Sequence, residues 1–145
     1  MKLSRTVSYA LHATMQLARS ESGGAPVPCS RLAAEGGMPE RFLLQILRNL
    51  VSHGILESTR GVEGGYSLGR SPKDISLLDL IEAVGGPVVS TLPIHDGLPA
   101  ELKLKLERTF SGVAEYTRQE LRAVTLAHLI PVEDGRVADG DGQQL

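Results

Sequence analysis

Apolar residues recur every three or four positions along the first fifty residues of the chain, which is the spacing of amphipathic helices. The pattern predicts a first helix over 4–20, which ends where glycine and proline accumulate in 22–28. A short helix is predicted over 29–35, followed by a glycine turn at 36–37. A third helix is predicted over 39–54, opened by a proline that suits the first helical turn. A short helix, a tight turn and a longer helix form the helix-turn-helix pattern.

The third predicted helix has two different faces. One face is an apolar stripe that we expect to point into the core, made of Phe42, Leu43, Ile46, Leu47, Leu50 and Val51. The opposite face carries side chains whose donors and acceptors match base edges and phosphates. We therefore predict DNA binding by Pro39, Glu40, Arg41, Gln45, Arg48 and Asn49. The alternative is an ordinary solvated helix face.

Two runs of alternating apolar and polar residues follow this helix and flank a glycine-rich tip, within 55–68. The pattern predicts a β-hairpin. We expect Gly61, Gly64 and Gly65 to adopt positive φ and to let backbone N–H groups approach phosphate, with Arg60 beside them. Next to a helix-turn-helix, such a hairpin is typical of a wing. An ordinary glycine-rich hairpin is the alternative.

The second half of the chain predicts two more helices. Ser76 and Asp79 fit a capping box that opens a short helix, and Gly85-Gly86-Pro87 ends it. Residues 88–98 show no clear period and are expected to form a loop. From Pro99, apolar residues at intervals of three or four predict one long helix to about residue 129.

So long a helix exceeds what a domain of this size can cover. We therefore expect it to pair with the same helix of a second chain in a two-fold homodimer. The predicted dimer interface consists of Leu106, Phe110, Val113, Thr117, Leu121 and Val124. The alternative is a helix that folds back on its own domain.

The predicted fold is mainly α with a small β-hairpin wing. We expect a winged helix-turn-helix DNA-binding domain over 1–86, and a loop with a long dimerisation helix over 87–130. Residues 131–145 are polar and are expected to form a flexible tail.

Charge is divided unevenly along the chain, although the net charge is only −2. Residues 1–73 hold nine Lys or Arg against five Asp or Glu, whereas residues 74–145 hold six against twelve. The basic half contains the predicted wing, as expected for a surface that meets phosphate. The start of the chain lacks the features of a signal peptide and the apolar runs are too short to cross a bilayer. We therefore expect a cytoplasmic protein with no membrane partner.

The sequence gives little support for catalysis or metal binding. It shows no nucleophile with a placed base and no phosphate-binding loop that opens a helix, so we predict that the chain is not an enzyme. The single cysteine, Cys29, excludes an internal disulfide and a metal site made chiefly of thiolates. Cys29 is interpreted as a small buried thiol, with a redox switch as the alternative. The histidines show no metal-ligand spacing.

Five segments in this order and spacing resemble the IscR-type family of bacterial winged-helix regulators, also called the Rrf-two family. They are Met1-Lys-Leu-Ser4 with Tyr9-Ala10, the predicted recognition segment 39–47, the predicted wing 60–66, and the segments 75–84 and 125–129. The resemblance covers Met1 to about Ile130. It implies a homodimeric transcription factor whose recognition helix enters the major groove while the wing enters the flanking minor groove.

The chain departs from this family at two places. Sensing members hold an iron-sulfur cluster with three cysteines between the short fourth helix and the dimerisation helix, but 88–98 contains no cysteine. His95 and Asp96 cannot replace three thiolates, so we predict a protein without cofactor. Leu44 stands where related proteins can carry an acid that discriminates between bases, so the resemblance does not transfer an operator sequence.

The function predicted from the sequence is a sequence-specific, DNA-binding transcriptional regulator that acts as a homodimeric repressor on double-stranded DNA. A winged-helix module for protein–protein interaction is one alternative, supported by the acidic second half. A small-molecule sensor that uses the 88–98 loop is another and can coexist with DNA binding. A small-molecule or protein effector is left open.

Overall fold

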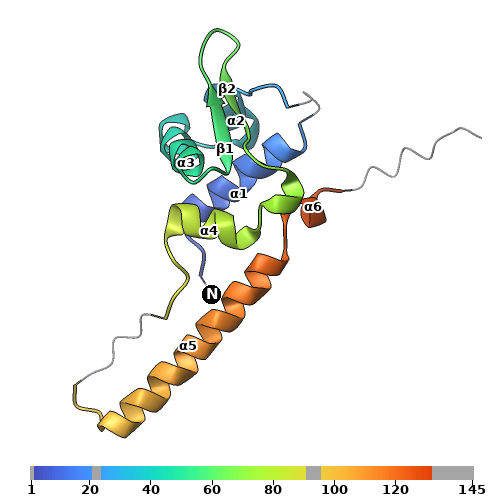
Figure 1. Cartoon of the computed structure of the whole chain (residues 1–145). Coiled ribbons are helices and arrows are strands. Elements are labelled where there is room, and N and C mark those ends of the chain that lie inside the picture. Colours follow the sequence, from blue (N-terminus) through green and yellow to red (C-terminus); the bar gives the residue numbers. More distant parts are fainter. Residues whose placement is uncertain (1, 21–23, 91–95, 132–145) are drawn as a thin grey trace, which may run out of the picture.

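The computed structural model describes residues 2–20, 24–90 and 96–131, so part of the 88–98 loop and most of the polar tail lie outside the described residues. The elements are α1 (Arg5–Ala18), α2 (Cys29–Gly36), α3 (Glu40–Ser52), β1 (Leu56–Thr59), β2 (Gly65–Leu68), η1 (Pro72–Asp74), α4 (Leu77–Gly85), α5 (Ala100–Ala123) and α6 (Leu126–Leu129). The fold is mainly helical with one two-stranded antiparallel hairpin, which confirms the predicted class. The hairpin projects at one end of the molecule, and α5 extends toward the opposite end (Figure 1).

The core lies where α1, α2, α3 and α4 meet. Four residues of the predicted α3 stripe are buried, namely Leu43, Ile46, Leu47 and Leu50. Val51 is half-buried. The prediction that Phe42 faces the core is wrong, because 45% of its surface is exposed. Phe42 lies at the edge of the stripe, where the ring of Tyr9 on α1 contacts it with centroids 5.9 Å apart.

The turn between α2 and α3 orients the longer helix. Gly37 ends α2 in the left-handed region with a φ of 63°, a conformation that glycine adopts without steric cost. Pro39 is the N-cap of α3 and not its first helical residue, so the predicted start is one residue early. Its carbonyl still accepts the first hydrogen bond of the helix, from the N–H of Leu43 at 2.9 Å.

Both strands of the hairpin contact the rest of the domain, β1 through α3 and β2 through α1 and Val27. Strands β1 and β2 pair from Leu56 opposite Leu68 to Thr59 opposite Gly65. Val27, in the segment that the sequence pattern treats only as a helix break, pairs with Tyr66 through hydrogen bonds of 2.8 and 2.9 Å. This bridge involves one residue of the segment, too short a stretch to show alternation, so the sequence pattern could not reveal it.

The capping box of α4 is confirmed, since Ser76 Oγ accepts from the N–H of Asp79 and Asp79 Oδ2 accepts from the N–H of Ser76, each at 3.0 Å. This cap fixes the start of the helix that packs against both α1 and α3. It therefore links the residues after the hairpin to the core.

The prediction of one helix to residue 129 is wrong, because α5 ends at Ala123 and the separate helix α6 follows. Val124 is extended, and its carbonyl accepts from the N–H of Leu77 at 2.9 Å. The N–H of Leu126 donates to Ile75 at 2.9 Å, and the Leu126 side chain is fully buried in the core. Burial of Leu126 and the backbone hydrogen bonds to Ile75 and Leu77 stabilise the break in the helix more than the helical hydrogen bonds of an uninterrupted α5 would.

Candidate nucleic-acid interface

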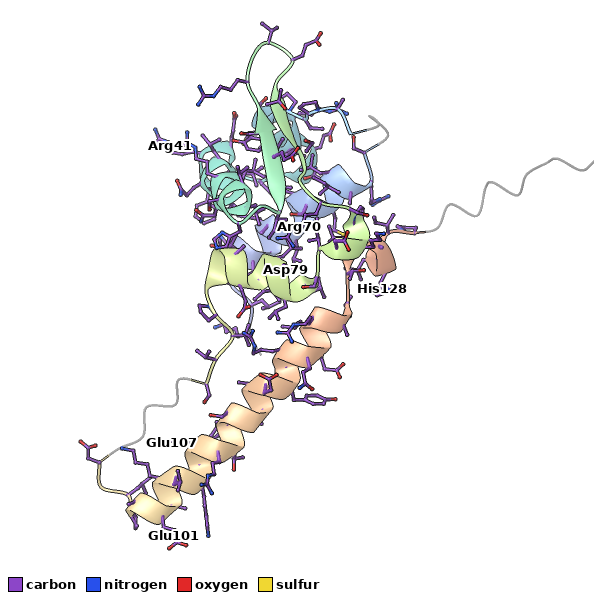
Figure 2. The ribbon with its side chains drawn as sticks, viewed as in Figure 1. Arg41, Arg70, Asp79, Glu101, Glu107 and His128 are labelled. Carbon is purple, nitrogen blue, oxygen red and sulfur yellow. The ribbon has the colours of Figure 1, made fainter. Side chains whose placement is uncertain are left out.

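The outer face of α3 presents the side chains that the sequence predicted for DNA binding. Arg41, Gln45 and Arg48 are exposed, and Asn49 is half-buried. Figure 2 shows Arg41 on the outer side of α3, away from the rest of the domain. Gln45 Nε2 donates to Asn49 Oδ1 at 3.5 Å, one turn further along the helix. The face thus carries two cations and a linked pair of amides, groups that suit phosphates and base edges.

Glu40 and Pro39 complete the predicted set at the start of α3, and both are exposed. Glu40 lies in the first helical turn, where a carboxylate interacts favourably with the positive end of the helix dipole. Its backbone carbonyl accepts a hydrogen bond from Cys29 Sγ at 3.7 Å. These two residues therefore serve the structure of the helix start in addition to any role toward DNA.

The wing tip is a tight turn between β1 and β2. The N–H of Gly64 donates to the carbonyl of Gly61 at 3.0 Å, so this amide is used within the turn. Gly61 has a φ of 111°, and a Cβ at this position would meet no atom within 4 Å. Arg60, just before the turn, is exposed. Open backbone and a cation therefore lie together at the tip.

The other two wing glycines are required by close backbone contacts, and of these two Gly65 has the predicted positive φ, 153°. Gly64 does not have a positive φ, and a Cβ there would collide with the carbonyl oxygen of Thr59. A Cβ on Gly65 would collide with the carbonyl group of Val27 across the bridge. Glycine at these two positions allows the hairpin to close and to pack on the 24–28 segment.

Three of the ten arginines among the described residues form ion pairs; the other seven are Arg5, Arg19, Arg41, Arg48, Arg60, Arg108 and Arg122. Arg31 pairs with Glu35 at 2.9 Å, Arg70 with Asp79 at 3.4 Å (Figure 2), and Arg118 with Glu82. By contrast, the structure over residues 2–20, 24–90 and 96–131 shows no ion pair for the three arginines of the predicted DNA face, Arg41, Arg48 and Arg60. Within the part of the chain that the structure describes, no carboxylate pairs with these three guanidinium groups.

These uncompensated cations lie on two elements that are in contact. Strand β1 follows α3 directly, and the N–H of Ile55 donates to the carbonyl of Leu50 at 3.0 Å. The positive φ of Gly54, 74°, turns the chain from the helix into the strand. The outer face of α3 and the wing consequently belong to one end of the domain (Figure 1).

Cys29 lies at the first position of α2, close to this surface. It is half-buried, and burial together with the neighbouring Glu40 carboxylate raises the pKa of its thiol. A raised pKa disfavours the thiolate, which is the reactive form of cysteine. The structure therefore favours the interpretation of Cys29 as a packing residue over a redox switch.

Helix α5 exposes apolar side chains along its length and buries none in this chain. Of the predicted dimer interface, Phe110 is 40% exposed and Val113 57% exposed. Leu106, Thr117 and Leu121 are half-buried. Val124 lies beyond the end of α5, so its assignment to the helical stripe is wrong.

Three further large apolar residues of α5 are exposed and are not part of the predicted interface. Leu102 is 44% exposed, Leu104 is 46% exposed and Tyr116 is 66% exposed. Leu102 continues the predicted stripe at a spacing of four before Leu106, and Tyr116 follows Val113 at a spacing of three. Leu102 already belongs to the apolar period that predicted this helix, and the same period extends to Tyr116.

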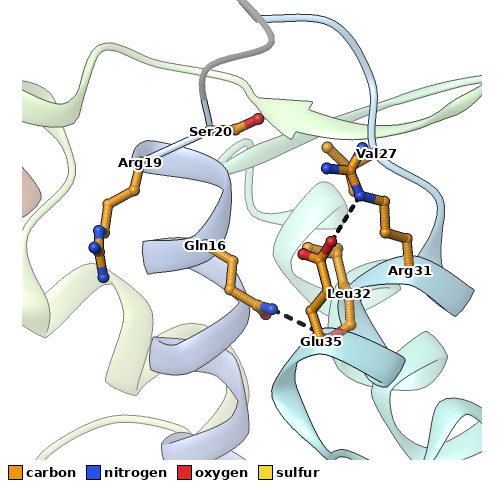
Figure 3. Close-up of a pocket in the computed structure, with 7 residues that line it drawn as sticks. All are labelled: Gln16, Arg19, Ser20, Val27, Arg31, Leu32 and Glu35. Atoms are coloured by element: carbon orange, nitrogen blue, oxygen red, sulfur yellow. Dashed lines mark hydrogen bonds and ion pairs between the residues drawn. The ribbon is translucent and has the colours of Figure 1, made fainter.

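Open pockets lie on the surface of the helical domain. One of about 400 Å³ lies between α1 and α2, where Gln16 Nε2 donates to the carbonyl of Leu32 at 3.3 Å (Figure 3). Arg31 at its rim is paired with Glu35, as Figure 3 also shows. A second pocket of about 550 Å³ is lined by His53, Ile55, Arg70, Asp79, Glu82, Ala83, Gly86 and Pro87. The second pocket adjoins the beginning of the 88–98 loop.

The residues do not fit an iron-sulfur cluster. Such clusters are held by cysteine thiolates, and the chain has only Cys29, at the start of α2. Among the described residues, no three His, Cys, Asp or Glu side chains gather into a group that could hold a metal ion. None of the described helices combines the length and apolar character needed to span a membrane.

Comparison with known proteins places the chain in a family. The Rrf2 family model, described as an iron-dependent transcriptional regulator, matches residues 3–131. The chain is 40% identical over 145 residues to Rv1287 of Mycobacterium tuberculosis, named as an HTH-type transcriptional regulator, which covers all of this chain and 84% of that protein. It is 29% identical over 135 residues to the HTH-type transcriptional regulator CymR of Bacillus subtilis, covering 93% and 94% of the two chains.

Solved structures show the same architecture. The structure of CymR, entitled the global cysteine regulator of B. subtilis, aligns with a TM-score of 0.71 at 28% identity over 89% of this chain and 95% of that one. A transcriptional regulator from Listeria innocua aligns with a TM-score of 0.72 at 28% identity over 100% and 97%. The predicted family is thereby confirmed. The chain belongs to the Rrf2 family of transcriptional regulators.

Proposed function

We propose that this protein is a sequence-specific, DNA-binding transcriptional regulator that acts as a homodimeric repressor. The observation that carries the proposal is the position of Arg41, Arg48 and Arg60, which are exposed and form no ion pair among the described residues, at the end of the domain formed by α3 and the wing. Unpaired guanidinium groups at one end suit a polyanion, because phosphate contacts release counterions and supply much of DNA affinity.

In this proposal the outer face of α3 enters the major groove and the wing contacts the adjacent backbone. The amides of Gln45 and Asn49 would read base edges, and Arg60 with the open backbone at Gly61 would meet phosphate. Gly64 and Gly65 would act through the shape of the wing. Family membership and the names of the relatives support regulation, and no catalytic step is part of the proposal.

The dimer is proposed from α5. A helix of 24 residues, about 36 Å long at 1.5 Å per residue, buries no side chain in its own chain and exposes Phe110 and Val113. Pairing with the same helix of a second copy would cover these side chains and present two copies of α3 to successive major grooves. Occupation of a promoter by such a dimer is a direct route to repression. Such a role requires access to the chromosome, so the proposal includes a cytoplasmic protein.

Salt-dependent binding to DNA tests the proposal. The probe is a duplex that the protein itself selects from a randomised pool, and affinity is measured by fluorescence anisotropy over a series of salt concentrations. Arg60→Ala in both subunits should reduce the slope of log K against log salt concentration by about 1.8, because each phosphate contact contributes about 0.9 to that slope. Arg48→Ala should also weaken binding.

Arg108→Ala is the matched control, because it removes the same charge from the exposed surface of α5, far from the wing. Its affinity and salt slope should equal those of the unmodified protein. If Arg48→Ala and Arg60→Ala behave like this control, the assignment of the DNA face is wrong.

A second candidate function, small-molecule sensing, is favoured by the pocket of about 550 Å³ beside the 88–98 loop. Its walls join the end of α3, the base of the wing and α4, so an occupant there would contact elements that carry the DNA face. The charges in the wall are the pair Arg70 and Asp79 together with Glu82. A screen of polar metabolites for a change in DNA affinity tests this role, and Ala83→Leu, which narrows the pocket, should abolish any response found.

A further inference from the structure

Phe42 is a large aromatic side chain on α3 that is not buried in the protein core. Its exposed fraction is 45%, whereas the next residue, Leu43, is completely buried. Single exposed apolar residues are common on protein surfaces and by themselves mean little. Phe42 differs because it lies in the first turn of α3, directly beside the unpaired cation Arg41.

The ring of Phe42 is held in a defined place. The ring of Tyr9, on α1, contacts it at 78° with the ring centroids 5.9 Å apart, which is an edge-to-face arrangement. At 100° per residue, Phe42 lies about 60° around the helix from Gln45 and about 20° from Asn49. The exposed part of the ring therefore borders the polar face that we propose reads DNA.

The major groove offers one apolar group to such a ring. Among the four bases only thymine carries a methyl group on its major-groove edge, and apolar side chains recognise it by contact. Residues in the first turns of a recognition helix are the ones that reach base edges. We propose that Phe42 contacts a thymine 5-methyl group and so selects thymine at one position of each half-site, while Tyr9 positions the ring.

This inference rests on the proposed DNA binding, and replacement of thymine by uracil tests it. The probe is the duplex selected by the unmodified protein from a randomised pool, with each thymine replaced singly by deoxyuridine, which removes the methyl group and preserves base pairing. At one thymine per half-site the substitution should weaken binding about fourfold, the value of one buried methyl group. At the other thymines it should have no effect.

The Phe42→Ala variant completes a double-mutant cycle. It should bind the thymine duplex at least about fourfold more weakly than the unmodified protein, and uracil at the same position should cause no further loss. Phe42→Leu, which keeps an apolar side chain, should retain part of the sensitivity to uracil. Tyr9→Phe, which keeps the ring, should retain all of it.

Three outcomes overturn the inference. The unmodified protein could be indifferent to uracil at every thymine, the Phe42→Ala variant could remain as sensitive to uracil as the unmodified protein, or Phe42→Ala could weaken binding to all duplexes equally. If binding stays steeply salt-dependent and sensitive to Arg60→Ala in these cases, only the role of Phe42 fails. If the protein binds no duplex at all, the proposed function fails with it. Thermal denaturation of each variant shows that folding is retained, and the uracil series on the unmodified protein needs no variant.

Discussion

Replacing Val113 by glutamate should dissociate the proposed dimer. Val113 lies in the middle of α5 and is 57% exposed in the single chain. Complete burial of a valine side chain stabilises by about 1.5–3 kcal/mol, so covering the exposed part contributes about 1 kcal/mol. A two-fold interface contains the residue twice, so loss of both valines costs about 2 kcal/mol of dimer stability. The two buried carboxylates add a further desolvation cost. The dissociation constant of the dimer should therefore rise at least about 30-fold.

Sedimentation equilibrium at several protein concentrations measures this change. Ser111→Glu is the matched control, because it adds the same charge to the same helix but lies about 200° around it from Val113, and Ser111 is exposed. The control should sediment like the unmodified protein, whereas Val113→Glu should be largely monomeric and should bind the selected duplex more weakly. An unchanged dimer for Val113→Glu, or a monomeric unmodified protein, would refute the pairing of α5.

Three further predictions concern the structure of the domain. Gly65→Ala should lower the free energy of unfolding by about 1–3 kcal/mol in a denaturant titration, because φ is 153° and a Cβ would collide with Val27. Ser76→Ala removes the capping hydrogen bond to Asp79 and should cost about 1 kcal/mol in the same assay. Cys29 should react with iodoacetamide more slowly in the folded protein than in denaturant, because its folded pKa is raised. Equal rates of reaction with iodoacetamide in the folded and denatured states would contradict the assignment. Because the pKa of the thiol is higher in the folded state, the neutral thiol favours folding, and this contribution to the free energy of unfolding is lost only as the pH rises into the alkaline range.

The parts of the fold that follow from local patterns could be predicted from the sequence. The stripe of α3 and the capping box at Ser76 depend on spacing within one helix or one turn, and both are present. The hairpin follows from its glycine-rich tip between alternating runs. The exposed cations Arg41 and Arg48 could be predicted as well, because they occupy the side of α3 opposite the stripe, and Arg60 could be predicted from its place beside the glycine-rich tip.

The parts that depend on contacts between distant segments could not be predicted. Val27 joins the hairpin through a single bridge, and Leu126 ends the long helix by entering a core built from residues far earlier in the chain. The close contact at Gly65 also depends on Val27, so the local pattern predicted the positive φ of this glycine but not the contact. Phe42 has the spacing of a core residue, but its ring packs against the edge of the Tyr9 ring and stays partly exposed. This arrangement depends on the position of Tyr9 on another helix.

The most direct test of DNA recognition by α3 and the wing is a crystal structure of the protein bound to a duplex that it has selected. We expect α3 to lie in the major groove with Gln45 at a base edge, and the turn after Arg60 to lie against the phosphate backbone, twice in each two-fold complex. A complex in which α3 and the wing face solvent while another surface holds the duplex would contradict the account.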